Sequence, residues 1–153
     1  CKKVEMSKTT GNHIVSILEK QGFLVVRSLG RVWRIQADMH HPYFIRKKIP
    51  FNLQQTYESG IIEWLHENIP SARTIILFGS YRKGDDIETS DLDIAVEVVD
   101  ERNQIIPLTL KNLGYRRDVP VQIHIFSRKS IDRNLFSSIA NGIILEGFLE
   151  VSP

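Results

Sequence analysis

The sequence predicts an α+β protein, in which a small mixed β-sheet carries helices on one side and follows a separate N-terminal helix and hairpin. Segments with apolar residues at helical spacing alternate along the chain with continuous β-prone runs, and this alternation is typical of a single mixed sheet. In the larger C-terminal part we expect a helix over 53–67, strands over 74–78, 89–96 and 119–126, and helices near 106–113 and over 129–140.

Length and composition are those of one folded domain with a small appendage. The chain has 153 residues, of which 42% are hydrophobic and 25% charged, and this composition excludes a disordered tail. No apolar run approaches the roughly 18 to 20 residues that span a bilayer, and no basic-then-apolar leader opens the chain, so no membrane segment is expected. The single cysteine, Cys1, excludes an internal disulfide and a multi-cysteine zinc site, which favours a cytoplasmic protein.

The first regular elements are a helix and a hairpin. The string Ser7-Lys8-Thr9-Thr10 offers N-cap residues, apolar residues then recur at helical spacing, and Gly22 supplies a C-terminal stop. Two β-prone runs over 23–27 and 31–35 flank a short loop that contains Gly30, which is typical of a hairpin. Residues 1–50 also hold ten Lys and Arg against three Asp and Glu, whereas the remainder has a net charge of −5. This basic first part favours a polyanion as its partner, although chance clustering of solvated charges is the alternative.

The helix and hairpin together resemble the second half of a winged helix-turn-helix. The residues that carry the resemblance are Met6 to Thr10, Ile14, Leu18 to Phe23 and Arg27 to Arg34. The resemblance implies that the helix enters the major groove and that the hairpin, or wing, contacts phosphates. The expected DNA contacts are Lys8, Thr9, Asn12, His13, Arg27 and Arg31. We expect the first helix of such a domain, and most of the second, to lie outside this chain; the alternative is an ordinary helix and hairpin that does not touch DNA.

These patterns predict three parts: a partial winged helix-turn-helix over 1–37, a linker over 38–52 and the main domain over 53–153. The linker contains the pair His40-His41. Because neither a cysteine nor a nearby carboxylate accompanies this pair, it is not expected to bind a metal.

The residues that point to chemistry lie between two predicted strands. Gly79 ends the run 74–78 and allows a sharp turn and a close ligand approach, and Ser80 adds a hydroxyl to the exposed backbone N–H groups. Asp91 and Asp93 share a face of the next strand, because alternate side chains of a strand point the same way. Two adjacent carboxylates repel each other unless a cation lies between them, and Mg²⁺ suits such ligands together with substrate phosphates. The alternative is a polar turn followed by an edge strand with solvated carboxylates.

The string from Gly79 to Asp93 resembles the signature of the polymerase β-like nucleotidyltransferase superfamily, and most closely that of the minimal nucleotidyltransferases. This signature is Gly-Ser, a later Gly, here Gly84, and then Ser-Asp-x-Asp. The resemblance extends over roughly residues 53–151. It implies that Asp91 and Asp93 are catalytic and bind two Mg²⁺ ions. The candidate nucleotide-binding residues are Gly79, Ser80, Arg82, Lys83 and Ser90, with ordinary surface charge as the alternative for Arg82 and Lys83.

One position departs from the family pattern. The family places a third carboxylate on the next strand, where this chain has Gln122. A glutamine oxygen can ligate Mg²⁺, so Gln122 is a candidate metal ligand beside Asp91 and Asp93, but it is uncharged and cannot accept a proton. In a two-metal mechanism, one cation activates the attacking oxygen and the other stabilises the leaving pyrophosphate. Loss of the third carboxylate should most weaken the first of these two metal sites. His124 shares the face of Gln122 and is either a substitute base or a histidine held in place by a hydrogen bond.

Two functions remain open at this stage. The first is a Mg²⁺-dependent enzyme that transfers a nucleoside monophosphate from an NTP to an acceptor and is coupled to a DNA-binding segment. The second is a DNA-binding transcriptional regulator whose transferase domain is catalytically weak and senses nucleotides. The main domain has little surface left for an acceptor, so a homodimer or a partner protein is expected. The sequence identifies neither the base of the NTP nor the acceptor.

Overall fold

The computed structural model describes residues 5–150, so Cys1 and Val151, which were used above, lie outside the described part. The chain divides into two compact units, residues 1–46 and 47–153. The division falls inside the segment that was predicted as a linker. Within the described residues, no helix is long and apolar enough to cross a membrane.

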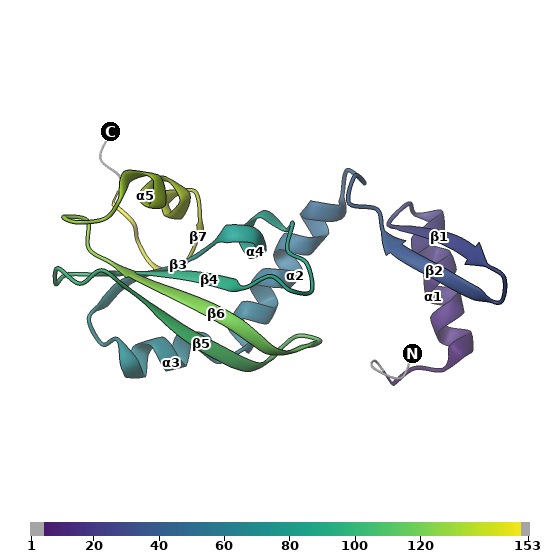
Figure 1. Cartoon of the computed structure of the whole chain (residues 1–153), viewed down its shortest axis with the longest axis horizontal. Coiled ribbons are helices and arrows are strands. Elements are labelled where there is room, and N and C mark those ends of the chain that lie inside the picture. The colour runs from purple at the N-terminus through teal and green to yellow at the C-terminus, as the bar shows by residue number, and fades with distance from the viewer. Residues whose placement is uncertain (1–4, 151–153) are drawn as a thin grey trace. The chain divides into compact units, whose positions relative to one another are not determined.

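The first unit contains α1 (Lys8–Lys20) and the antiparallel strands β1 (Leu24–Leu29) and β2 (Val32–Ala37) (Figure 1). The side chain of Ser7 accepts a hydrogen bond from the N–H of Thr10 at 3.1 Å and so caps the start of the helix. Gly22 follows the helix with a φ of +79°, in the left-handed region that ends many helices. The predicted helix and hairpin are therefore confirmed, whereas the winged helix-turn-helix stays a prediction.

Part of the segment predicted as a linker is helical, because α2 (Phe44–Glu58) begins within it. Pro50 lies inside this helix, where its missing N–H and its ring normally disrupt helical hydrogen bonding. Tertiary contacts hold the helix on the far side of the proline: the buried side chain of Asn52 donates to the carbonyl of Tyr81 at 3.0 Å. Sequence reasoning placed residues 38–52 in a linker because these contacts are not local.

The single helix predicted over 53–67 is wrong, since the structure has two helices there. α2 ends before Gly60, and α3 (Ile61–Asn68) follows it. Gly60 has a φ of +78°, a conformation that a continuous right-handed helix excludes. The hydroxyl of Ser59 donates to the carbonyl of Thr56 at 2.6 Å and closes the last turn of α2.

The second unit is built on a five-stranded sheet in the order β5-β6-β4-β3-β7. Its elements are β3 (Ala72–Phe78), α4 (Gly79–Lys83), β4 (Leu92–Val98), β5 (Gln104–Leu113), β6 (Arg116–Phe126), α5 (Arg133–Ala140) and β7 (Ile143–Gly147). β4 and β6 run parallel, and the other neighbours are antiparallel. The predicted α+β class with a small mixed sheet is confirmed.

The helix predicted near 106–113 is wrong, because β5 occupies these residues. Ile106, Leu108 and Leu110 are half-buried, whereas the residues between them are exposed. This period of two identifies a strand with one face against the core. Pro107 is tolerated because β5 lies at the edge of the sheet, where one row of backbone N–H groups needs no strand partner.

Helices cover both faces of this sheet, and not one face as predicted (Figure 1). On one face, α3 buries Leu65 in a large cluster that includes Ile94 of β4. On the other face, α5 buries Ile139 in a smaller cluster that includes Ala95. Because neighbouring side chains of a strand point to opposite faces, Asp93 shares the face of Ala95 and α5. The candidate site therefore lies on the less extensively covered face.

Candidate active site

The Gly-Ser turn and the second acidic residue are in contact. Gly79 joins β3 to α4 with a φ of +70°, and a β-carbon built on it would lie 2.1 Å from Oδ2 of Asp93. Only glycine allows the backbone to approach the carboxylate this closely. Ser80 follows Gly79 and is half-buried. The turn therefore lies directly beside the carboxylate of Asp93.

Strand pairing places Asp93 between a residue of β3 and a residue of β6. It is in register with Phe78 at the end of β3 and with Gln122 of β6. Paired residues of neighbouring strands point to the same face, so the amide of Gln122 lies beside the carboxylate of Asp93. Gln122 thus occupies the place where the family pattern calls for a third carboxylate.

The two acidic side chains interact electrostatically. Asp91 lies immediately before β4 and, like Asp93, is half-buried. Burial raises the pKa of Asp93, and the negative charge of Asp91 raises it further. A bound cation would offset this repulsion between the two carboxylates.

The ligands predicted for a metal at this site are oxygen atoms. No cluster of three or more His, Cys, Asp or Glu side chains suited to a metal ion exists within the described part of the chain. The candidate set is therefore the carboxylates of Asp91 and Asp93 with the amide oxygen of Gln122. Hard divalent cations such as Mg²⁺ prefer such a set and commonly complete it with water and substrate phosphates. The residues present fit a metal of this kind.

His124 lies at the edge of the same group. Its Nε2 atom is 4.0 Å from Oδ1 of Asp93, and its ring packs edge-on against Phe78 with the centroids 5.1 Å apart. Nδ1 is buried and has no hydrogen-bond partner among the described residues. Burial also lowers the pKa of His124. The ring is therefore held by packing, and not by the hydrogen bond that sequence reasoning favoured.

The remaining candidate nucleotide contacts lie along the same loop. The hydroxyl of Ser90 accepts a hydrogen bond from the N–H of Ile87 at 2.9 Å, so this side chain stabilises the loop itself. Arg82 and Lys83 lie in the last turn of α4, where Arg82 is half-buried and Lys83 exposed. Contacts of these three side chains with a nucleotide stay predictions.

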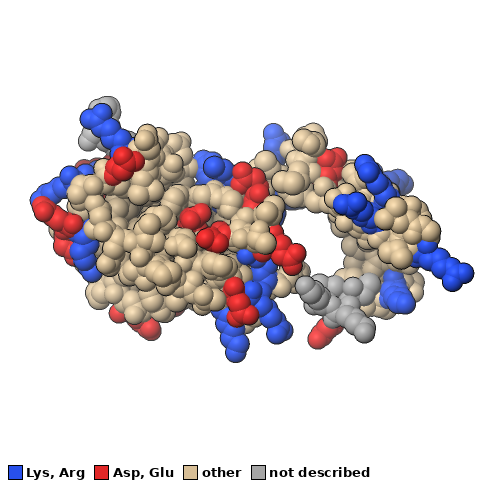
Figure 2. Space-filling model, viewed as in Figure 1, with Lys and Arg blue, Asp and Glu red and all other residues tan. Residues whose placement is uncertain are grey.

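The residues predicted to bind DNA all belong to the first unit. Exposed side chains are found at Lys8, Thr9, Asn12 and His13 of α1, at Arg27 of β1 and at Arg31 of the hairpin turn. Arg27 is in register with Arg34 across the hairpin, so two arginines lie side by side on this wing. Among the charged side chains on the visible face of this unit, Lys and Arg predominate (Figure 2). DNA binding by these residues stays a prediction.

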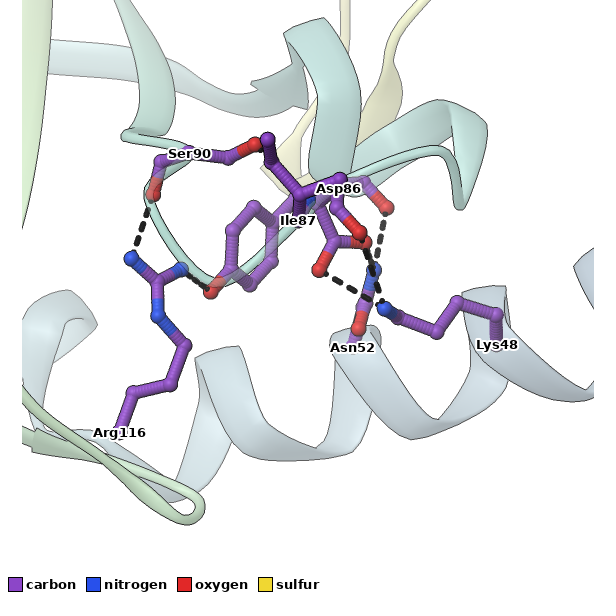
Figure 3. A network of polar contacts seen from close by, with 7 residues as sticks. Lys48, Asn52, Asp86, Ile87, Ser90 and Arg116 are labelled. Atoms are coloured by element: carbon purple, nitrogen blue, oxygen red, sulfur yellow. Dashed lines mark hydrogen bonds and ion pairs between the residues drawn. The ribbon is translucent and has the colours of Figure 1, made fainter. Parts of the chain in front are cut away.

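Sequence reasoning missed a polar network around the loop between α4 and β4 (Figure 3). The buried carboxylate of Asp86 accepts a hydrogen bond of 2.5 Å from Asn52 and pairs with Lys48 at 3.0 Å. Arg116 donates to the hydroxyl of Tyr81. Lys48 and Asn52 lie in the segment predicted as a linker, and no local pattern connects either of them to the loop.

A comparison with protein families decides the classification. Residues 60–146, more than half of the chain, match the family described as polymerase beta, nucleotidyltransferase. The chain belongs to this nucleotidyltransferase family. The matched range includes the Gly79–Asp93 string and Gln122, and the resemblance that this string indicated is confirmed. The segment that resembles a winged helix-turn-helix lies outside the match.

Individual proteins of this class are also similar to the chain. Over 53 residues it is 45% identical to the protein adenylyltransferase MntA of Shewanella oneidensis, and the match covers 35% of this chain and 38% of that relative. The chain therefore matches less than half the length of this curated relative. It also resembles a crystal structure from Sulfolobus solfataricus named as a nucleotidyltransferase, with 17% identity, a TM-score of 0.40, and coverage of 74% of this chain and 99% of that one.

Proposed function

We propose that this protein transfers AMP from ATP to a hydroxyl group of a protein, in a reaction that requires Mg²⁺. Membership of the nucleotidyltransferase family supports transfer of a nucleotide. The name of the adenylyltransferase relative supports ATP as the donor and a protein as the acceptor. The observation that carries the proposal is the direct contact of the Gly79 turn with Asp93, which brings a phosphate-binding turn and a metal-binding carboxylate together.

Each part of the site has a separate task in this reaction. Gly79 and Ser80 bind the triphosphate through backbone N–H groups and the serine hydroxyl, in the manner of other phosphate-binding turns. Asp91, Asp93 and Gln122 hold Mg²⁺, which when bound neutralises phosphate charge and lowers the pKa of an attacking hydroxyl. Because Asp93 also abuts Gly79, it would hold a metal beside the residues that bind the triphosphate.

The reaction itself is a displacement at the α-phosphorus of ATP. The acceptor oxygen forms a bond to this phosphorus, the bond from the phosphorus to the bridging oxygen breaks, and pyrophosphate leaves with that electron pair. The hydroxyl proton must pass to a base. Gln122 has no basic site, so the bases available on this face are the two carboxylates and His124.

The acceptor reaches the site from outside this unit. His124, whose Nε2 atom is 4.0 Å from Asp93, lines a groove of about 280 Å³ together with Ile105 and Leu135, so a largely apolar surface begins beside Asp93. A partner protein, or a second copy of this chain, would supply the acceptor hydroxyl through such a surface. The first unit would bring DNA to the same chain through its exposed basic residues, with binding strength dependent on salt.

A second function is favoured by one observation, the presence of Gln122 in register with Asp93. An amide in place of a carboxylate removes one negative charge and one proton acceptor from the site. In this second function the unit binds ATP with Mg²⁺ but turns it over slowly, and the protein acts as a DNA-binding regulator that senses nucleotides.

Labelled ATP separates the two functions. The protein would be incubated with Mg²⁺, a cell extract and ATP labelled at the α-phosphate. One portion of the products would then be treated with protease and another with nuclease. Label that protease releases, and that Asp93→Asn fails to transfer, supports protein adenylylation. Label that only nuclease releases would assign a nucleic acid as the acceptor. ATP binding without transfer supports the regulator, and no binding of ATP at all contradicts both functions.

A further inference from the structure

The segment between the Gly-Ser turn and the acidic pair is fixed at several points by side chains from elsewhere in the fold. It begins at α4 and continues through residues 84–91, here called the connecting loop, which has no regular structure up to the start of β4. The connecting loop ends at Asp91. The position of Asp91 relative to Gly79 therefore depends on how this loop is held.

Arg116 contacts both ends of this segment (Figure 3). One terminal nitrogen of its guanidinium donates to the hydroxyl of Tyr81, which follows the Gly-Ser turn, and the other donates to the carbonyl of Ser90 at 2.7 Å. The guanidinium also lies 5.7 Å from the centre of the Tyr81 ring. A guanidinium has a planar, rigid arrangement of donors, so these two bonds fix the distance between the groups that they join.

The middle of the connecting loop is held from α2. Asp86 is 9% exposed, and its carboxylate pairs with Lys48 at 3.0 Å. Asn52 donates to the same carboxylate at 2.5 Å and to the carbonyl of Tyr81 at 3.0 Å. These contacts anchor the middle of the loop, whereas Arg116 reaches the residue that directly precedes Asp91.

In the described part of the chain, Asp91 lies outside the strand pairing of β4. Asp93 is held by strand pairing on both sides, with Phe78 and with Gln122. Strand pairing of β4 with β6 begins only at Leu92. The backbone ahead of it is held within the loop by hydrogen bonds between Ser90 and Ile87, and to the rest of the fold by the hydrogen bond from Arg116 to the carbonyl of Ser90. We propose that Arg116 is a positioning residue, which sets the place of Asp91 relative to the Gly-Ser turn and so completes the metal site. This inference rests on the proposed function, because it requires that Asp91 binds a metal.

The chain offers a close control for a test of Arg116. Arg117 is the next residue of β6, carries the same charge and is exposed. Arg116→Gln removes the two hydrogen bonds, whereas Arg117→Gln removes only a surface charge. Arg116→Lys retains the charge but loses the planar arrangement of donors, and Tyr81→Phe removes one of the two acceptors with little change in shape.

The experiment measures Mn²⁺ binding by calorimetry in the presence of a non-hydrolysable ATP analogue, together with amide hydrogen exchange of residues 84–91. Residues that orient metal ligands typically change metal affinity by about 10- to 100-fold when replaced. We therefore expect Arg116→Gln to weaken Mn²⁺ binding by about 10-fold or more and to speed exchange in the connecting loop, with Arg117→Gln unchanged. Arg116→Lys should not restore the affinity, and Tyr81→Phe should give a smaller loss than Arg116→Gln.

The outcomes separate this inference from the proposed function. Wild-type affinity and exchange in Arg116→Gln, equal losses in both glutamine variants, or full recovery with lysine would each overturn the role of Arg116. Absence of Mn²⁺ binding by the wild-type protein would instead overturn the proposed metal site, and with it this inference. If circular dichroism shows that Arg116→Gln does not fold, Tyr81→Phe decides the question, and wild-type affinity in that variant overturns the inference.

Discussion

The carboxylate of Asp93 lies against the backbone of Gly79 so closely that a β-carbon on Gly79 would be 2.1 Å from Oδ2 of Asp93. A turn from the end of β3 and a side chain from β4 thereby form one surface. This contact explains why a glycine is required there beyond its φ of +70°, since a residue with a side chain would have to displace the carboxylate.

The first prediction concerns this glycine. Gly79→Ala should reduce nucleotide transfer by about 100-fold or more, because a displacement of catalytic groups by about 1 Å has an effect of this size. The substitution should also destabilise the protein by about 1 to 2 kcal/mol, because an alanine at this position must adopt a left-handed backbone conformation. Gly60→Ala is the matched control, since Gly60 has a φ of +78° but no atom within 4 Å of the added carbon. Equal activity losses in the two variants would show that backbone strain, and not the contact with Asp93, matters.

The second prediction concerns the charge of Asp93. Burial and the charge of Asp91 raise the pKa of Asp93 in the folded protein. Ionisation of this carboxyl therefore opposes folding once the pH exceeds the pKa that the group has in the unfolded chain. Asp93→Asn should therefore raise Tm by a few degrees at pH 7 in the presence of EDTA. The gain should shrink as the pH falls through about 4 and disappear below about 3, where the carboxyl is protonated in the folded and unfolded states alike.

Thermal unfolding at several pH values checks this second prediction. Asp85→Asn is a suitable control, because Asp85 lies in the same loop and is exposed. An Asp93→Asn protein that is less stable than the wild type at pH 7 without metal would contradict the expectation. The same variant should lose the stabilisation that Mg²⁺ with ATP gives the wild type, since a ligand stabilises only the state that binds it.

The third prediction concerns the residue that departs from the family pattern. Gln122→Glu places a third carboxylate beside Asp93 and adds a proton acceptor to the site. If Gln122 limits the rate, kcat should rise, with about 100-fold as the expected order for an added general base. Asn112→Asp adds the same charge at an exposed position of the edge strand β5 and should leave kcat unchanged. An unchanged or lower kcat in Gln122→Glu would contradict the idea that Gln122 limits the rate.

The fourth prediction concerns the first unit. Replacing Arg27 and Arg31 together by Gln should weaken DNA binding and lower the slope of log affinity against log salt by about 2, because each phosphate contact contributes about one unit. Lys111→Gln, an exposed change in the second unit, is the control. The readout is a gel shift at several salt concentrations. A slope that the double variant leaves unchanged would exclude these two arginines as phosphate contacts.

Local chemistry made much of the fold predictable. Ser7 and Gly22 mark the ends of α1 because capping depends on neighbouring residues only. The continuous apolar run of β3 and the acidic start of β4 are likewise visible in the sequence. Two errors arose where the pattern was ambiguous: a short apolar stretch fits both a helix and a strand, so β5 was taken as a helix, and Gly60 was overlooked as a helix break.

The candidate site divides in the same way. The Gly79–Asp93 string could be found from the sequence because its signature is local, and its resemblance to the nucleotidyltransferase superfamily indicated the family that the match over residues 60–146 confirms. That Asp91 and Asp93 share a face follows from the alternation of side chains along a strand. Only the tertiary structure decided that Gln122 lies beside Asp93, that His124 has an unpartnered nitrogen, and that Arg116 reaches Ser90. These contacts join residues more than 20 positions apart, and their register depends on how strands and helices pack, which no local pattern encodes.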